Sequence, residues 1–387
     1  MPLLYLVVCL NIAALGTVIP LLPFYAIHFG AGDGTAPLVF SIFSGAGLLT
    51  APLWGRLSDY IGRRPVMLTC IATTIISYLW LANAQSLWEV FASRALAGAA
   101  SGWLAAAQAY VADSTTEDNR AKGMGLLGAS IGLGFVIGPT MGGIAVGGAA
   151  PNYALPSILA GSFSVAGFIV ALFFLKEPMA RTPQPSDSET SASQTVTGWR
   201  VLTSDILARL FLIYLCVFLA FTALEGTFPL WCKAVLSLGP RDVSWYMAFI
   251  GVIMVIVQGG LVGRLSRHYG ESRLMLAGIA LIALGLGGLP FSGGVWMALF
   301  PLTAISVGFG LQNPAMQSLI SRAAPHDLQG GALGAAQSVA SFARILGPAW
   351  GGAVFVSLGP DWPYFIGALA LAPVLLIALP LVRRFQP

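Results

Sequence analysis

The chain has 387 residues, of which 57% are hydrophobic and only 9% are charged, and its net charge is +4. A soluble domain carries about 25% charged residues, so this composition excludes a water-soluble protein and predicts an integral membrane protein. A basic nucleic-acid-binding face would need many more charges, so we expect no nucleic-acid partner.

Apolar stretches of about 20 residues, the length of a membrane-spanning helix, recur along the chain. In order they are 2–27, 36–55, 65–84, 88–112, 123–147, 154–175, 210–236, 243–262, 274–291, 295–321, 331–357 and 362–382. Their length excludes the strands of an outer-membrane barrel, which alternate over segments of about 10 residues. The sequence therefore predicts an all-α membrane protein with twelve transmembrane helices, and we expect it to be a monomer in the lipid bilayer.

Lysine and arginine are distributed unevenly around these stretches. If the N-terminus is cytoplasmic, 15 of the 19 basic residues fall in cytoplasmic segments. Lys233 and Arg241 fall in outer loops, whereas Arg94 and Arg344 fall inside apolar stretches. Because cytoplasmic loops are enriched in basic residues, we expect a multi-pass protein of the inner (plasma) membrane with both termini in the cytoplasm.

Two segments of the chain are repeated. The tetrapeptide Gly-Arg-Leu-Ser occurs at 55–58 and at 263–266, an offset of 263 − 55 = 208 residues. GPTMGG at 138–143 matches GPAWGG at 347–352, an offset of 347 − 138 = 209. Such duplication is typical of secondary transporters. We therefore expect two pseudo-symmetric six-helix halves, at 1–175 and 210–387, joined by a polar cytoplasmic linker at 176–209.

The loop between the second and third stretches, GRLSDYIGRR, combines charged residues with glycines. Gly55 permits close helix approach and Gly62 permits a tight turn. The Asp59 carboxylate can accept hydrogen bonds from Arg63 and Arg64. The pattern resembles the loop signature G-x-L-x-D-x-x-G-R-R of the major facilitator superfamily, and the resemblance extends over essentially the whole chain. It implies the major facilitator fold and a cytoplasmic gate between the halves at these five residues.

The fourth stretch carries Arg94, Ser101 and Gln108 at intervals of seven, which places them on one face of a helix. Its segment RALAGAASG resembles a family segment whose arginine is tied to proton transfer. The alternatives are that Arg94 extends to the outer interface or pairs with Glu89, and that the other polar residues only join helices.

Glycines recur every four residues in the fifth stretch, at Gly134, Gly138 and Gly142, followed by Gly143. Pro139 removes a backbone donor and bends the helix. The segment is similar to the fifth-helix signature of the family's proton-coupled drug and tetracycline antiporters, which implies export rather than uptake. Simple helix packing is the alternative.

Glu225 is the only one of the 15 acids in the middle of an apolar stretch. A carboxyl group there favours its protonated form unless a cation or water stabilises the anion, which suits a proton carrier. Arg344 is the candidate partner, and a permanent Glu225–Arg344 pair is the structural alternative. Many drug exporters of the family place an acid in the first helix, where this chain has Asn11, so coupling would depend mainly on Glu225.

Amide and aromatic side chains in the apolar stretches suit a small amphipathic substrate. These candidate substrate-binding residues are Asn11, Gln108, Phe228, Trp231, Gln258, Asn313 and Gln317.

The expected function is proton-coupled antiport that exports a small amphipathic compound, as in multidrug or tetracycline efflux, by alternating access. The sequence has no GxxxxGK[ST] phosphate loop and no nucleophile–base constellation, so an enzyme is not expected. Its four cysteines and three histidines are scattered, so neither a metal nor a cofactor is expected. The alternatives are a facilitator or symporter for a small organic anion or metabolite, and a sensor or assembly factor that does not transport.

Overall fold

The computed structural model describes residues 1–148, 151–178, 205–325 and 328–384, so most of the predicted linker lies outside the described residues. The described residues form helices and connecting segments and contain no strand. The first group of helices comprises α1 (Pro2–Val18), η1 (Ile19–Leu21), α2 (Leu22–His28), α3 (Leu38–Ile61), α4 (Arg63–Ala82), α5 (Leu87–Ala99), α6 (Trp103–Asp113), α7 (Glu117–Val146) and α8 (Ala154–Phe174). The second group comprises α10 (Asp205–Leu236), α11 (Pro240–Ile256), η2 (Val257–Leu261), α12 (Val262–Tyr269), α13 (Glu271–Gly288), η3 (Leu289–Phe291), α14 (Val295–Ala323), α15 (Gln329–Leu358) and α16 (Trp362–Arg384).

Eleven helical segments of the described residues are long and apolar enough to cross a membrane. The first runs from α1 through α2, and the seventh runs from α11 through α12. The predicted stretch at 88–112 is divided between α5 and α6, which have 13 and 11 residues and are each too short to span a bilayer alone.

The break between α5 and α6 shows that the prediction of one continuous helix over 88–112 is wrong. At the break, the carbonyl oxygen of Ala99 accepts hydrogen bonds from Thr50 Oγ1 at 2.9 Å and from Trp54 Nε1 at 2.5 Å. Both donors belong to α3, which packs against α5. Side chains of a neighbouring helix thus satisfy the backbone where the helix is interrupted, as a membrane environment requires.

The sequence repeat recurs in the backbone. Gly62 follows α3 with a φ of 102°, and Gly270 follows α12 with a φ of 80°. Glycine adopts this left-handed region readily, and the offset of 270 − 62 = 208 equals that of the repeated tetrapeptide. α7 and α15 each contain 30 residues and an internal proline, Pro139 and Pro348. The duplication therefore extends from the sequence to the turns and long helices.

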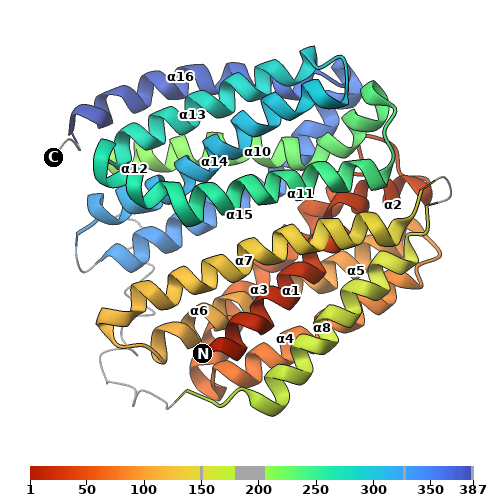
Figure 1. Ribbon diagram of the computed structural model, residues 1–387, viewed down its shortest axis with the longest axis vertical. Helices are drawn as coiled ribbons and strands as arrows, with labels where there is room; N and C mark the ends of the chain where they lie inside the picture. Colours follow the sequence, from red (N-terminus) through yellow and green to blue (C-terminus); the bar gives the residue numbers. More distant parts are fainter. Residues whose placement is uncertain (149–150, 179–204, 326–327, 385–387) are drawn as a thin grey trace.

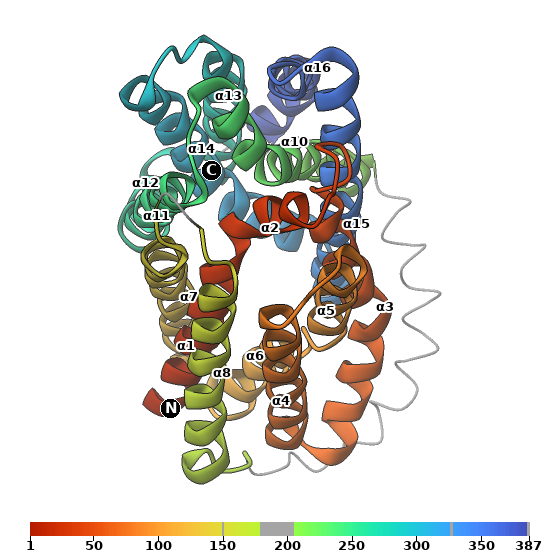
Figure 2. The ribbon, with the colours of Figure 1, turned by 90° about the vertical axis from the view of Figure 1, so that its right-hand side faces the viewer.

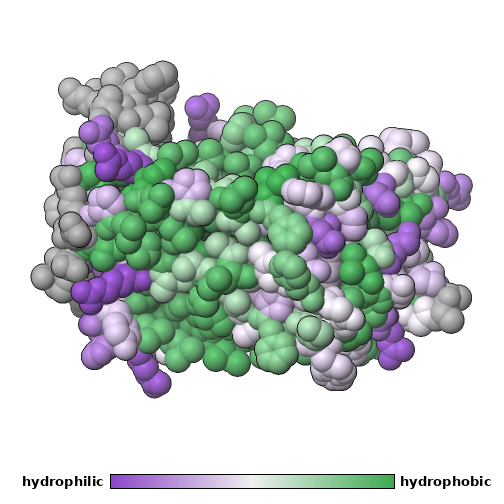
Figure 3. Space-filling model, turned by 90° about the horizontal axis from the view of Figure 1, so that it is seen from above, coloured by the Kyte–Doolittle hydropathy of each residue, from purple (hydrophilic) through white to green (hydrophobic). Residues whose placement is uncertain are grey.

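The first group fills the lower part of Figure 1 and the second group the upper part. α8 ends and α10 begins on the left of this view, which we call the linker end, and the opposite end is the loop end. α2 lies where the two groups meet (Figure 2). In Figure 3, apolar residues cover much of the middle of the visible face, and hydrophilic residues gather toward the ends. This distribution fits a bilayer around the middle of the molecule.

Contacts between α3 and α15 lie toward the loop end. Ser41 Oγ, in the first turn of α3, donates a hydrogen bond to the carbonyl oxygen of Ile345 at 2.6 Å. Farther along α3, Leu49 is 79% exposed, Leu53 is 64% exposed and Tyr60 is 89% exposed. α3 therefore joins the second group near the loop end and is uncovered toward the linker end.

Candidate functional site

Tyr214 of α10 and two amides of α14 form a hydrogen-bonded cluster in the second group. Tyr214 Oη donates to Asn313 Oδ1 at 2.9 Å, and Gln317 Nε2 donates to the same oxygen at 3.3 Å. A spacing of four residues places Asn313 and Gln317 on one face of α14. Tyr214 is buried, Asn313 is half-buried and Gln317 is exposed, so the amides are accessible from one side.

Aromatic rings extend this polar cluster along α10. The ring centre of Phe218 lies 4.6 Å from that of Tyr214 and 5.3 Å from that of Phe309. Phe221 stacks on Phe309 at 3.9 Å. The guanidinium carbon of Arg344 lies 5.6 Å from the centre of the Phe218 ring, which is a cation–π arrangement. We call this set the interior cluster: Tyr214, Phe218, Phe221, Phe309, Asn313, Gln317 and Arg344.

Glu225 follows Phe221 by four residues on α10, and its side chain is half-buried. Arg344 lies on α15, which packs against α10 at this level, since Thr222 Oγ1 donates a hydrogen bond to the carbonyl oxygen of Ala343 at 3.0 Å. However, the ion pairs of the described residues do not include these two side chains. The permanent Glu225–Arg344 pair, expected as the structural alternative, is therefore not formed. The carboxyl can gain or lose a proton here without breaking an ion pair.

Arg94 of α5 is 1% exposed and lies inside the first group. Its Nη2 donates to Ser77 Oγ at 2.9 Å, and its guanidinium carbon lies 5.2 Å from the centre of the Tyr78 ring. Its Nε has no hydrogen-bond partner within the described part of the chain. Glu89 instead accepts a hydrogen bond from the backbone N–H of Gln85 at 2.7 Å. Both structural alternatives for Arg94, extension to the interface and pairing with Glu89, are therefore wrong.

The other amides predicted to bind substrate lie in separate places. Asn11 is 3% exposed, and its Nδ2 donates to the carbonyl oxygen of Val7 at 2.9 Å. It lies against Gly167, so it is packed between α1 and α8. Gln108 is exposed on α6, beyond the break, so the predicted stripe from Arg94 through Ser101 does not follow one continuous helix.

Gln258 is exposed in η2, a π-helical turn that lies against Gly310 of α14. Single π-helical turns often occur at functional sites. Gln258 is thus placed next to α14 at Gly310, which precedes Asn313 by about one helical turn. Among the described residues, no hydrogen bond joins Gln258 to Asn313 or Gln317.

Phe228 and Trp231 are completely buried near the loop end. Trp231 Nε1 donates to Asp361 Oδ1 at 2.7 Å, and its ring meets that of Tyr364 edge to face. Phe228 packs against Trp231 and Tyr246. Enclosed side chains do not reach a substrate in this state, so substrate binding by these two residues stays a prediction for another state.

The glycines of α7 form the contact with α1. A Cβ atom on Gly138 would lie 2.5 Å from the carbonyl oxygen of Ala13, and one on Gly134 would lie 2.8 Å from that of Cys9. Gly142 packs on α1 in the same way. A side chain at these positions would separate the two helices, so close approach depends on the glycines.

Gly143 and Pro139 complete this part of α7. A Cβ atom on Gly143 would lie 2.7 Å from Cβ of Ser244 in α11, so this glycine faces the second group. Pro139 Cδ lies 3.1 Å from the position that a Cβ atom on Gly16 would take. α7 therefore contacts α1 through the face that carries Gly134, Gly138 and Gly142, and it contacts the second group through Gly143.

The predicted gate loop makes its contacts within the first group. Arg63 forms ion pairs with Asp59 and, through Nε at 2.9 Å, with Asp113. The Glu177 carboxylate accepts the backbone N–H groups of Arg63 at 2.6 Å and Arg64 at 3.0 Å, which caps the start of α4. Each of these partners belongs to the first group, so the gate stays a prediction for another state.

Tyr214, Phe218 and Phe221 are absent from the residues predicted from the sequence, although a signal for them exists. Together with Glu225 they recur at intervals of four, three and four residues, which places all four side chains on one side of α10. Asp113 and Glu177 are absent as well, because their contacts with the gate loop join residues far apart in the chain and leave no local pattern.

The helices are long and apolar enough to span a membrane, and they enclose an arginine and bring amides, aromatic rings and a carboxyl group together. This combination is typical of a polytopic membrane transporter. The chain belongs to the Major Facilitator Superfamily, whose family model matches residues 4–348 and again residues 259–387. The overlap of the two matches agrees with the internal duplication. The predicted membership of this superfamily is confirmed.

Relatives of the chain include resistance proteins that match it over most of their length. It is 29% identical to the tetracycline resistance protein, class C, of Escherichia coli, over 97% of this chain and 94% of that protein. It is 25% identical to multidrug resistance protein 2 of Bacillus subtilis (strain 168), over 92% of this chain and 88% of that protein. The predicted kinship with the drug and tetracycline exporters is thus confirmed.

Solved structures share the fold at lower identity. The nucleoside transporter NupG superposes with a TM-score of 0.82 at 13% identity and covers 98% of each chain. The human organic anion transporter MFSD10 (TETRAN) superposes with a TM-score of 0.74 at 22% identity, over 97% of this chain and 98% of that chain. These likenesses concern the fold alone.

Proposed function

We propose that the protein is a proton-coupled antiporter that exports a small amphipathic compound, such as a tetracycline or another drug, by alternating access. The observation that carries the proposal is Glu225, a half-buried carboxyl beside the interior cluster that shares no ion pair with Arg344. The tetracycline and multidrug resistance proteins among its relatives support export of such compounds.

The proposed coupling follows from the charges near the cluster. When Glu225 is ionised, its negative charge is balanced by the field of Arg344 and by a cationic or polar substrate. When Glu225 is protonated, it loses its attraction for such a substrate, and Arg344 repels a cation. Proton binding and substrate binding therefore compete, and exchange of one for the other is the elementary step of antiport.

The interior cluster supplies the recognition surface in this proposal. Aromatic faces from Phe218, Phe221 and Phe309 suit the apolar rings of a substrate, and Asn313 and Gln317 can orient its polar groups. Charged and amide side chains exposed on spanning helices are costly against lipid, so we place them beside a water-filled path.

We place twelve membrane spans in two halves, residues 1–175 and 210–387, joined by a linker at 176–209. α5 and α6 together form the fourth span in chain order, which brings the eleven long helical segments to twelve. Their 13 and 11 residues are long enough to cross a bilayer only in combination. The basic linker end faces the cytoplasm of the inner membrane in this proposal. The state described, with α3 uncovered at that end, then opens toward the cytoplasm, and Asp59, Arg63 and Arg64 latch the halves in the opposite state.

Reconstituted vesicles test the antiport. The purified protein is inserted into vesicles and tetracycline or ethidium movement is followed after a pH jump of either sign. An antiporter moves substrate against its own gradient in the direction opposite to the proton flow. Substrate movement that ignores the imposed pH gradient would contradict proton coupling and leave a facilitator.

Arg94 favours one alternative, transport of a small organic anion by a facilitator or symporter. It is a buried guanidinium whose Nε has no partner in the described residues, and with Arg344 it could hold a carboxylate. Its 1% exposure keeps it away from substrate in this state. Vesicle uptake of benzoate in the direction of the proton flow would favour this alternative.

A further inference from the structure

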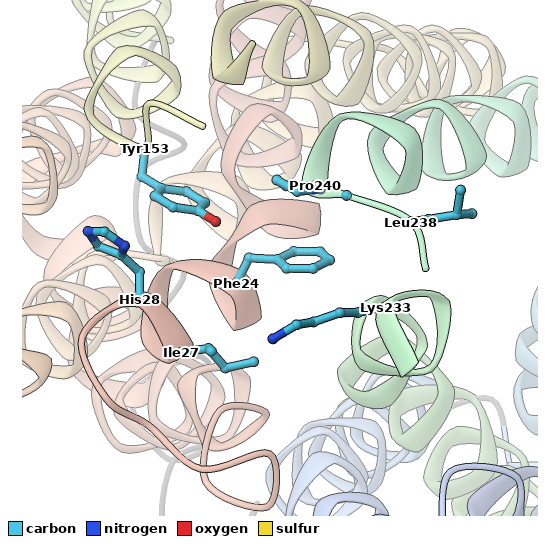
Figure 4. Close-up of a pocket in the computed structure, with 8 residues that line it drawn as sticks. Phe24, Ile27, His28, Tyr153, Lys233, Leu238 and Pro240 are labelled. Carbon is cyan, nitrogen blue, oxygen red and sulfur yellow. The ribbon is translucent and has the colours of Figure 1, made fainter. Parts of the chain in front are cut away.

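A pocket of about 220 Å³ lies at the loop end, between the two groups of helices (Figure 4). Its walls come from α2 and the start of α8 in the first group, and from the end of α10 and the start of α11 in the second. We call it the loop-end pocket, and its lining residues are Phe24, Ile27, His28, Tyr153, Lys233, Leu238, Gly239 and Pro240. The pocket is complete only while the two groups meet at this end.

The lining combines an apolar floor with cationic and hydroxyl groups. In Figure 4 the hydroxyl of Tyr153 points toward Phe24 from one side, and the side chain of Lys233 runs along the other side of Phe24 so that its ammonium ends near Ile27. Tyr153 is held by stacking on Tyr25, with ring centres 5.2 Å apart and planes inclined by 15°. The His28 ring lies 5.4 Å from the Tyr153 ring. These groups would present donors to an anion whose apolar body rests on Phe24.

Lys233 supplies the cationic side chain of the pocket lining. Of the two basic residues in the predicted outer loops, Lys233 lines the pocket. Arg241 follows the lining residue Pro240, but its guanidinium lies near Gly148. Lys233 takes part in none of the ion pairs of the described residues. The nearby acid Asp242 accepts the backbone N–H of Gly239 at 3.2 Å and caps α11. The start of α11 adds the positive end of a helix dipole.

From this geometry we infer that the loop-end pocket is a regulatory site for a small amphipathic carboxylate, with a size near that of naphthoate. The carboxylate binds the Lys233 ammonium and the Tyr153 hydroxyl, and its apolar part packs on Phe24 and Pro240. Because such a ligand contacts both groups, its binding energy favours the state in which they meet at the loop end. A carboxylate bound in the loop-end pocket therefore slows the transport cycle, although it does not bind at the interior cluster.

Binding of 2-naphthoate to the purified protein in phosphatidylcholine nanodiscs tests the site directly. We expect saturable binding that raises Tm, and about tenfold weaker binding of neutral 2-naphthamide, since one charge-assisted contact is lost. Lys233→Gln should weaken naphthoate binding by a similar factor, whereas Lys233→Arg should retain it. Arg267→Gln, which removes an exposed basic residue at the linker end, is the matched control and should bind as the wild type does.

Several results would overturn the inference. They are equal affinity of wild type and Lys233→Gln, equal affinity for the acid and the amide, and absence of saturable binding. Direct binding is independent of the transport mode, so failure of the proposed antiport would leave this test intact.

A cross-linking rate tests the effect on conformation. Ser41 and Ile345 touch across the two groups near the loop end, so a Ser41→Cys/Ile345→Cys protein reports when the groups meet there. Naphthoate should raise the rate of oxidative cross-linking several-fold. The two proteins that carry only one of the substitutions, Ser41→Cys or Ile345→Cys, measure the background from the four native cysteines. An unchanged or lower rate would contradict stabilisation of this state.

Discussion

Glu225 and Arg344 lie on neighbouring helices of the second group without forming an ion pair. Arg344 instead faces the Phe218 ring at 5.6 Å and is exposed, while Glu225 is half-buried. A permanent pair would stabilise the bundle and resist proton exchange. Since the two side chains do not form this pair, the carboxyl can gain or lose a proton without breaking an ion pair.

Replacement of Arg344 by Gln should therefore affect function more than stability. No ion pair is lost, so the free energy of unfolding should change by less than about 1 kcal/mol, the range of weak exposed interactions. Proton-driven flux per molecule should fall because the charge that balances Glu225 is gone. A large drop in Tm with normal flux per folded molecule would show that Arg344 is structural.

Gly138 tests the close contact between α1 and α7. Its replacement by Ala puts a Cβ atom 2.5 Å from the Ala13 carbonyl oxygen, and overpacking of this kind costs about 1–3 kcal/mol. We expect a clear fall in Tm of the detergent-solubilised protein. Gly128→Ala is the matched control, because open space surrounds that position on the same helix. Equal Tm values for the two variants would contradict the contact.

Arg94→Met separates a functional from a structural arginine. Arg94 has no carboxylate partner in the described residues, so its removal leaves no unpaired buried acid, and exchange for an apolar side chain is then neutral or stabilising. We expect an unchanged or higher Tm, together with a loss of transport of at least about tenfold if the charge takes part in proton transfer. Reduced Tm with normal transport would reverse this assignment.

Trp54→Phe tests how the break between α5 and α6 is held. The indole N–H donates to the Ala99 carbonyl oxygen at 2.5 Å, and a buried polar group that loses a partner costs about 1–3 kcal/mol. Thr50 keeps one hydrogen bond to the same oxygen, so we expect the free energy of unfolding to fall by about 1 kcal/mol, the lower end of this range. The measurement is a fall in Tm. Trp88→Phe, at a tryptophan that is 63% exposed, should leave Tm unchanged.

Periodicity and repetition predicted much of the architecture. The length of each apolar stretch predicted a span, because the thickness of the bilayer sets the length of every spanning helix separately. The repeat predicted corresponding turns, and Gly62 and Gly270 are 208 residues apart, as the repeated tetrapeptides are. The break after Ala99 was not predictable in the same way. It depends on Thr50 and Trp54, which are 49 and 45 residues away and act only in the folded bundle.

Prediction of the candidate site was less complete for a related reason. Asn313 and Gln317 are adjacent amides on one helix face, so their spacing revealed them. Asn11 has the same chemistry but is packed against Gly167, and no local signal distinguishes a helix–helix contact from an open face. The spacing of Tyr214 and Phe218 places them on the same face of α10 as Glu225, but only the fold brings Asn313 and Arg344 beside that face.

The most direct test of the proposed mechanism is transport by Glu225→Gln in proteoliposomes, measured both as substrate exchange and as flux driven by a pH gradient. We predict that substrate exchange continues with weaker substrate affinity, because the fold and the aromatic and amide side chains remain but the attraction of the ionised carboxyl is lost. Gradient-driven flux should fall at least about tenfold through loss of the titrating group. Glu89→Gln, which keeps an acceptor for the Gln85 N–H, is the control and should retain both activities. Gradient-driven flux of wild-type magnitude in Glu225→Gln would contradict the account.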